Sequence, residues 1–217
     1  MKKTFLYIAL LWFLFSCSSQ DTLKQNEWAS EMKKREIILA LWDSLTAGYG
    51  VEESENYPNK LQKKLDDGGY NYEVINAWVS GDTSANVLSR AWLYVDKNPS
   101  IVILVVWGND ALRWLSTTDL QENISKIIDT FPNSKVVLGG MDIPANLWGQ
   151  YRNEFKKVYS EIAKQKQWIY FMEFFLDGVA GNSELNISDM IHPNSEGYDI
   201  IVKNLMNFLE ENNIITK

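Results

Sequence analysis

The sequence predicts a three-layer α/β/α domain with a mostly parallel sheet of about five strands. Two observations predict it: short continuous apolar runs recur along the chain, and segments with helical periodicity lie between them. A strand of a parallel sheet is covered on both faces, so it carries apolar side chains at successive positions. Strands that alternate with helices favour such a sheet. The chain has 217 residues, which is enough for one domain with a sizeable core.

The apolar runs are the expected strands. Residues 37–41 read Ile-Ile-Leu-Ala-Leu, and residues 101–106 read Ile-Val-Ile-Leu-Val-Val, the strongest strand pattern in the chain. Both are continuous, as burial on two faces requires. The expected strands are residues 37–41, 72–75, 101–106, 135–138 and 169–171.

The segments between these runs are the expected helices. In the clearest one, apolar side chains at 120, 124, 127, 128 and 131 fall on one helical face. Pro58 suits the first turn of a helix, and a C-terminal amphipathic pattern runs to Leu209. The expected helices are residues 57–65, 83–95, 120–131, 148–164 and 198–209.

The N-terminus has the features of an export signal, expected over residues 1–17. Lys2 and Lys3 precede an apolar run at residues 5–15 that is too short to span a bilayer comfortably. The run ends in Leu-Phe-Ser-Cys, which resembles a bacterial lipobox, so Cys17 is the expected lipidation site. A small apolar residue within a leader peptide is the alternative. Because Cys17 is the only cysteine, a disulfide is not expected.

A polar tether is expected over residues 18–35, before a domain at residues 36–217, although residues 28–34 also fit a short amphipathic helix. The expected location is the bacterial cell envelope, with the chain held by a lipid anchor, or otherwise secreted. The net charge is −7 and long basic runs are lacking, which argues against nucleic acid as a partner. The membrane is an expected partner, through the anchor.

Polar residues gather after the first three expected strands, and again near the C-terminus. In an open α/β sheet, ligands bind beyond the carboxyl ends of the strands, so the pattern itself indicates a serine hydrolase. The four segments are Asp43-Ser44-Leu45-Thr46, Ser80-Gly81-Asp82-Thr83, Gly108-Asn109-Asp110 and Asp189-Met190-Ile191-His192-Pro193-Asn194.

In order along the chain, these segments resemble the four sequence blocks of the SGNH (GDSL-type) hydrolases. The resemblance spans residues 37–209 and implies a flavodoxin-like fold. Residues 142–147 and 174–181 resemble the thioesterase, lysophospholipase and arylesterase branch of that family. The resemblance therefore implies a serine esterase that hydrolyses carboxylic or thio esters through an acyl-serine intermediate, with a small-molecule or lipid ester as the expected substrate. The resemblance implies neither a metal nor an organic cofactor, and a lone histidine does not build a metal cluster.

The expected catalytic residues follow from their chemistry. Ser44 is the nucleophile, and it needs an adjacent base. His192 is the only histidine in the chain, so it is the expected general base. Asp189 is expected to orient its ring. The resemblance implies an oxyanion hole made by the backbone N–H groups of Ser44 and Gly81 and the side-chain amide of Asn109.

Each of these residues also has a structural interpretation. Ser44 fits a helix cap, His192 a structural histidine, and Asn109 a turn residue. Asp43 and Asp110 are expected to hold loops by hydrogen bonds rather than to act in catalysis. A carbohydrate O-deacetylase is the alternative enzyme, and a non-catalytic lipoprotein that binds lipid or glycan is the alternative from another class.

Five tryptophans stand where the family or its branch shows glycine, a residue used there for positive φ or close backbone approach. A bulky residue at positive φ is an outlier. One hypothesis is a decayed site. The other is that the gene encodes glycine at these positions through UGA codons, which some bacteria reassign and other code tables read as tryptophan. The intact candidate catalytic residues favour the second hypothesis. The five positions are Trp42, Trp78, Trp107, Trp114 and Trp148.

Overall fold

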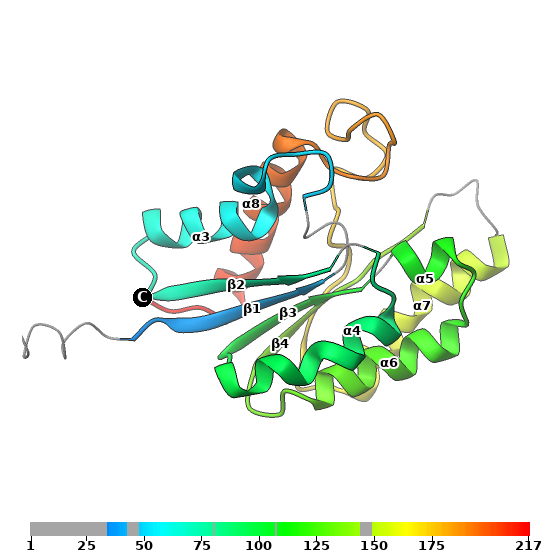
Figure 1. Ribbon diagram of the computed structural model, residues 1–217, viewed down its shortest axis with the longest axis horizontal. Helices are drawn as coiled ribbons and strands as arrows, with labels where there is room; N and C mark the ends of the chain where they lie inside the picture. The colour runs from blue at the N-terminus through cyan, green and yellow to red at the C-terminus, as the bar shows by residue number, and fades with distance from the viewer. Residues whose placement is uncertain (1–33, 43–47, 80, 107, 144–148) are drawn as a thin grey trace, which may run out of the picture. The chain divides into compact units, whose positions relative to one another are not determined.

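A computed structural model describes residues 34–42, 48–79, 81–106, 108–143 and 149–217. The chain divides into two units, Met1–Arg35 and Glu36–Lys217, and the fold described here is that of the second. Its centre is one sheet of five parallel strands in the order β2-β1-β3-β4-β5 (Figure 1). The strands are β1 (Glu36–Trp42), β2 (Tyr72–Trp78), β3 (Ile101–Val105), β4 (Lys135–Gly139) and β5 (Tyr170–Met172).

Helices cover both faces of this sheet, so the predicted three-layer fold is confirmed. Helices α3 (Tyr57–Asp67) and α8 (Ser195–Glu211) pack together on one face (Figure 1). Helices α4 (Ser84–Ala91), α6 (Thr117–Asp129) and α7 (Gly149–Gln165) cover the other. The remaining helical segments are η1 (Glu53–Glu55), η2 (Trp92–Lys97) and α5 (Gly108–Leu112).

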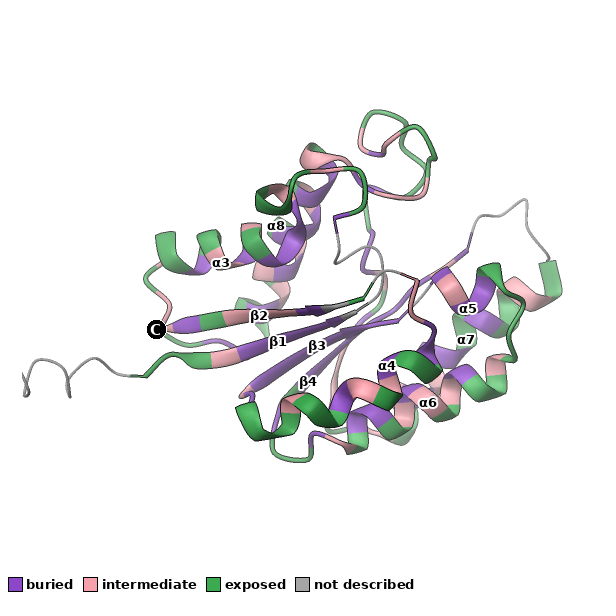
Figure 2. Cartoon of the chain, in the orientation of Figure 1, coloured by how far each residue is buried: buried purple, intermediate pink, exposed green. Residues whose placement is uncertain are grey.

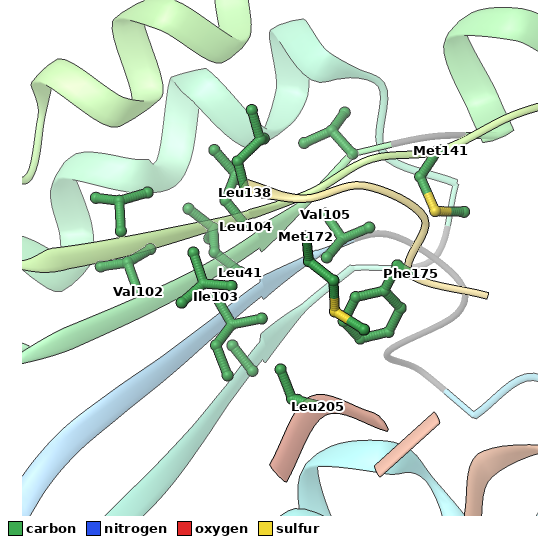
Figure 3. Close-up of a cluster of buried hydrophobic side chains, with 14 of the residues drawn as sticks. Leu41, Val102, Ile103, Leu104, Val105, Leu138, Met141, Met172, Phe175 and Leu205 are labelled. Atoms are coloured by element: carbon green, nitrogen blue, oxygen red, sulfur yellow. The ribbon is translucent and has the colours of Figure 1, made fainter. Parts of the chain in front are cut away.

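The strands form the core because their side chains are apolar on both faces. All five residues of β3 are buried, and Figure 2 shows the central strands as buried along most of their length. Figure 3 shows Val105 of β3 beside Met172 and Phe175, with Leu205 of α8 in the same buried cluster. Burial of such a side chain stabilises the fold by about 1.5–3 kcal/mol. The continuous apolar runs therefore correspond to strands of a sheet that helices cover on both faces.

Side-chain caps set where four of the helices begin. Asn56 accepts a hydrogen bond from the backbone N–H of Asn59 at the start of α3, and Pro58 lies in the first turn. Thr83 caps α4, Ser116 caps α6 and Asn194 caps α8 in the same way. An N-cap of this kind typically stabilises a helix by about 1 kcal/mol.

The predicted helix at residues 83–95 differs from the observed structure. Regular α-helix ends at Ala91, and the chain continues as the 3₁₀ segment η2 until Asn98, which is left-handed at φ 50°. In η2, Trp92 and Leu93 are exposed. The apolar periodicity therefore continued past the end of the buried helix face.

Helix α5 was not expected, and its C-terminus carries Trp114 in a left-handed conformation, with φ 56°. The N–H of Trp114 donates to the carbonyl of Ala111, and the N–H of Leu115 donates to that of Asp110. This pair of bonds is the Schellman motif, which most often places glycine where Trp114 lies.

The other four tryptophans give less information. Trp42 and Trp78 are the last residues of β1 and β2 and have strand backbone, so positive φ does not explain a glycine there. Trp107 and Trp148 lie outside the described residues.

Candidate active site

Three strand ends meet at one edge of the sheet. Strand β1 lies between β2 and β3, and Trp42 is in register with Trp78 on one side and Val105 on the other. The chain leaves β1 toward β2 and later returns to the opposite neighbour, β3. Such a switch point opens a crevice beyond the carboxyl ends of the strands. The carboxyl ends of β1, β2 and β3 therefore lie side by side, at the place where the sequence predicts the polar segments.

Asp189 holds His192 through both of its carboxylate oxygens. Oδ2 lies 2.6 Å from Nδ1 of His192, and Oδ1 accepts the backbone N–H groups of Ile191 and His192, each at 2.9 Å. Burial raises the pKa of Asp189, but the hydrogen bonds from His192 and Ile191 outweigh it and hold the pKa below its ordinary value. The ionised carboxylate fixes the proton on Nδ1, which leaves Nε2 to accept a proton.

The backbone around His192 is a compact turn. The N–H of Ile187 donates to the carbonyl of His192 at 2.8 Å, and the N–H of Met190 donates to Ile187 at 2.9 Å. Asn186 and Pro193 form an antiparallel bridge. Met190 takes a left-handed conformation, with φ 62°, a local strain that is common at functional sites. His192 is thus fixed directly before α8.

Gly81 follows β2 in a conformation that favours glycine, with φ +84°. The nearest atom to an added Cβ is Nη2 of Arg113, at 3.8 Å, so the backbone angle and not the space requires glycine. The same Nη2 donates to the carbonyl oxygen of Gly81 at 2.9 Å. Arg113 therefore ties the end of α5 to the segment after β2.

The side-chain amide of Asn109 is a candidate hydrogen-bond donor to a ligand. Its Nδ2 atom is buried and has no hydrogen-bond partner among the described residues. A buried donor without a partner costs about 1–3 kcal/mol, which is a reason to expect that it serves a ligand. The amide lies in the first turn of α5, directly after β3, where an oxyanion donor was expected.

Asp110 has a structural role, as expected. It is buried and accepts the backbone N–H of Ser84 at 2.7 Å and the Ser84 hydroxyl at 2.6 Å. Asn123 donates to the same hydroxyl at 2.9 Å. Burial raises the pKa of Asp110, and the bonds from Ser84 oppose that shift. Asp110 thus joins α5 to the start of α4 and to α6.

The segment after β4 carries Asp142, part of the expected branch motif. Arg152 of α7 donates to both of its carboxylate oxygens, at 2.8 and 2.6 Å. A cavity of about 510 Å³ opens beside this ion pair. Among the described residues, neither Asp189 nor His192 lines the cavity. The described residues that line it are Met141, Asp142, Lys156, Met172, Glu173, Phe174, Asp177 and Asn204.

Several expected residues lie outside the described part of the chain, namely Ser44, Asp43 and Cys17. The distance from Ser44 to His192 therefore stays a prediction, and so do the catalytic roles. Two neighbours of the site were not foreseen. Arg113 contacts Gly81, and the ring of Tyr49 lies against His192. Both contacts join segments that are distant in sequence and that no local pattern connects.

Two classes of feature are missing from the residues that the structure describes. Within these ranges, His, Cys, Asp and Glu side chains nowhere gather in the groups of three that could hold a metal ion. Over the same residues, none of the helices has the length and apolar character needed to cross a membrane.

Comparison with known proteins gives a consistent result. The sequence model of the GDSL-like lipase/acylhydrolase family matches residues 40–200. The esterase TesA of Pseudomonas aeruginosa is 36% identical over 161 residues, which cover 73% of this chain and 80% of TesA. The arylesterase of Vibrio mimicus is 32% identical, covering 86% of this chain and 88% of its own.

A third relative and a solved structure give the same result. Thioesterase 1/protease 1/lysophospholipase L1 of Escherichia coli is 30% identical, over 76% of this chain and 79% of its own. The crystal structure of TesA superposes with a TM-score of 0.77 at 34% identity, covering 81% of this chain and 99% of that one. Sequence and backbone thus point to the same group of proteins.

Proposed function

We propose that this chain, which belongs to the GDSL-like lipase/acylhydrolase family and is a serine esterase, hydrolyses carboxylic or thio esters through an acyl intermediate on Ser44. The observation that carries the proposal is the Asp189–His192 pair, with 2.6 Å between Oδ2 and Nδ1. An ionised aspartate on Nδ1 prepares a neutral imidazole to act as general base.

The reaction then runs in two halves. His192 Nε2 takes the proton of the Ser44 hydroxyl while Oγ attacks the ester carbonyl. The tetrahedral intermediate collapses with loss of the alcohol or thiol, which takes the proton back from His192. Water, deprotonated by His192, then attacks the acyl-serine. The second tetrahedral intermediate collapses with release of the acid, and Ser44 Oγ takes the proton back from His192. Asp189 stays ionised and stabilises the imidazolium in both halves.

The oxyanion of each tetrahedral intermediate needs preorganised donors. The proposed donors are the N–H groups of Ser44 and Gly81 and the amide of Asn109. The left-handed backbone of Gly81 and the buried, unpaired Nδ2 of Asn109 support this assignment. Loss of one such donor typically costs about 2.7–4 kcal/mol of transition-state stabilisation.

The substrate class rests on the relatives. Their names include esterase, arylesterase and thioesterase/lysophospholipase, which supports acyl esters of lipids or small alcohols and thiols. A carbohydrate O-deacetylase is the second enzyme candidate. An acetyl xylan esterase of known structure is 20% identical, a similarity that speaks for the fold alone.

The proposal for location rests on the sequence of the N-terminus. We propose that residues 1–17 are an export signal, that Cys17 is lipidated, and that residues 18–35 tether the domain at 36–217 to the cell envelope. The apolar run that stops at Cys17 supports this. In fractionated cells, the Cys17→Ala variant is expected to leave the membrane fraction. A variant that stays membrane-bound would contradict the lipid anchor.

The activity is tested with p-nitrophenyl esters of short and medium acyl chains. Ser44→Ala and His192→Ala are each expected to lower kcat by about a thousandfold or more. Ser160→Ala is the matched control and is expected to keep full activity, because Ser160 is a partly buried serine of α7 whose hydroxyl donates to the Lys157 carbonyl of the same helix. Fatty-acyl esters compared with acetylated sugars separate the two enzyme candidates.

The tryptophan positions enter this test. The assay is made with the sequence as given and with glycine at Trp42, Trp78, Trp107, Trp114 and Trp148. Absence of Ser44-dependent turnover in both forms would favour the non-catalytic lipoprotein.

A further inference from the structure

The ring of Tyr49 lies against the imidazole of His192. The two ring centroids are 4.9 Å apart, and the ring planes are inclined by 47°. Tyr49 is 57% exposed, whereas the side chain of His192 is only 16% exposed. In Figure 1 the part of the chain from residue 48 to η1 runs beside the segment before α8. Tyr49 thus covers the imidazole from the solvent side.

The turn that carries Tyr49 is built to hold this contact. Tyr49 stands between Gly48 at φ +69° and Gly50 at φ +86°, and the N–H of Val51 closes the turn on the carbonyl of Gly48 at 3.0 Å. A Cβ on Gly50 would lie 2.6 Å from Cδ1 of Ile187. The turn therefore packs directly on Ile187.

Ile187 connects this turn to the histidine. Its N–H donates to the carbonyl of His192 at 2.8 Å. Ile187 therefore contacts both the turn that carries Tyr49 and the turn that carries His192. A Cβ on Gly48 would lie 2.7 Å from Cβ of Asn56, the N-cap of α3. The turn is thus packed on both sides, and the position of the Tyr49 ring follows from that packing.

We propose that Tyr49 is a positioning residue for His192: its ring keeps the imidazole on Asp189 and stabilises the positive charge that the imidazole gains during catalysis. This rests on the proposed role of His192 as the base. A cation within about 6 Å of an aromatic centroid is attracted by the ring, so the contact strengthens when His192 becomes charged. An interaction that is stronger in the transition state raises kcat.

Charge and water also favour this arrangement. Asp189 holds one edge of the imidazole at 2.6 Å, and the aromatic ring lies beside it at 4.9 Å. With water displaced from the ring, the attraction between the imidazolium and the carboxylate is stronger. An exposed tyrosine that only recognised substrate would act on KM and not on kcat.

The kinetic test compares substitutions of Tyr49 on the same p-nitrophenyl ester. Tyr49→Leu and Tyr49→Ala are expected to lower kcat about three- to thirtyfold at an unchanged KM. Tyr49→Phe keeps the ring and is expected to keep the activity. Trp168→Leu removes another exposed aromatic ring and serves as the control. Thermal unfolding verifies that each variant folds.

A second measurement does not depend on activity. Because His192 is the only histidine in the chain, its imidazole ring protons give one set of NMR signals without assignment. The aromatic ring current of Tyr49 is expected to shift these signals, and the shift is expected to vanish in Tyr49→Leu and to remain in Tyr49→Phe.

Three results would overturn the proposal. They are a rise in KM at constant kcat in Tyr49→Leu, unchanged kinetics in that variant, and a loss in Tyr49→Phe as large as in Tyr49→Leu. Ser44→Ala and His192→Ala are measured in parallel. If both are inactive while Tyr49→Leu is not impaired, the positioning role fails and the esterase mechanism stands. If both remain active, the mechanism itself fails.

Discussion

A tryptophan in the left-handed region is costly, and Trp114 occupies such a position at the end of α5. Left-handed backbone costs a residue other than glycine about 1–2 kcal/mol. Trp114 recovers part of that cost through its ring contact with Tyr151, at 5.6 Å between centroids. The backbone at this position thus matches the glycine hypothesis, independently of any sequence pattern.

Trp114→Gly is therefore expected to raise the free energy of unfolding by about 1 kcal/mol. Urea unfolding followed by circular dichroism measures the change. The control is Trp168→Gly, at an exposed tryptophan that is not among the residues with positive φ, where no gain is expected. Equal or lower stability of Trp114→Gly would contradict the assignment, and a UGG codon at position 114 would end the recoding hypothesis there.

Asp189 links catalysis to pH through its hydrogen bonds with His192. Asp189→Asn is expected to lower kcat by about 10³–10⁴-fold, since the amide no longer fixes the proton on Nδ1.

The pKa of Asp189 is below its ordinary value in the folded protein, so its ionisation favours folding. This contribution is complete above the ordinary aspartate pKa of about 3.9 and is lost as the pH falls through the lower folded value.

Thermal unfolding of the two proteins across pH checks this second effect. The difference in stability between Asp189 and its asparagine variant is expected to shrink below about pH 4. A difference that is constant from pH 7 to pH 3 would mean that the carboxylate charge does not stabilise the turn.

The sequence singled out candidate site residues that stand in recognisable motifs. It did not single out residues whose part in the site depends on a contact with a distant segment of the chain. Asp189, His192 and Gly81 stand in recognisable blocks. Tyr49 gained no role from the sequence because its partner lies in another segment of the chain. Arg113 contacts Gly81 only through the turn that ends α5, and a five-residue helix leaves too short a pattern to predict.

Among the elements, the start of α8 depends on an ionic cluster with α3. Nζ of Lys60 lies 2.9 Å from Glu55, 2.8 Å from Asp199 and 3.1 Å from the Ser195 hydroxyl, and Ser195 also donates to Glu55. Burial lowers the pKa of Lys60, but the bonds to Asp199 and Glu55 raise it above its ordinary value. Lys60 thus stays charged and holds the first turn of α8, directly after the histidine segment.

Lys60→Met is expected to lower the free energy of unfolding by about 1–2 kcal/mol, since three charge-assisted bonds are lost from a side chain that is mostly buried. A fall in kcat is also expected, because the turn before α8 loses its support. Lys63→Met, on the exposed side of the same helix, is the control. Equal melting temperatures for the two variants would show that the cluster adds nothing to stability.

For the whole domain, the sequence was sufficient to predict the layers and the parallel sheet. Continuous apolar runs such as residues 101–106 fit only strands covered on both faces, and β3 is buried throughout. The order β2-β1-β3-β4-β5 brings together the carboxyl ends of β2, β1 and β3, after which the polar segments were expected. The end of the helix at Ala91 was missed because exposed apolar residues in η2 continue the periodicity.

The place of His192 in the chain also affects how the protein matures. The histidine segment comes after all five strands and leads into the last helix, whereas β1 begins the domain and lies inside the sheet. A chain that leaves the ribosome N-terminus first can build much of the sheet before residue 192 has emerged. Such a partly synthesised chain has no imidazole, so it cannot cleave esters by this route. Ester cleavage by this route therefore reports that the chain has been synthesised past all five described strands, as far as His192.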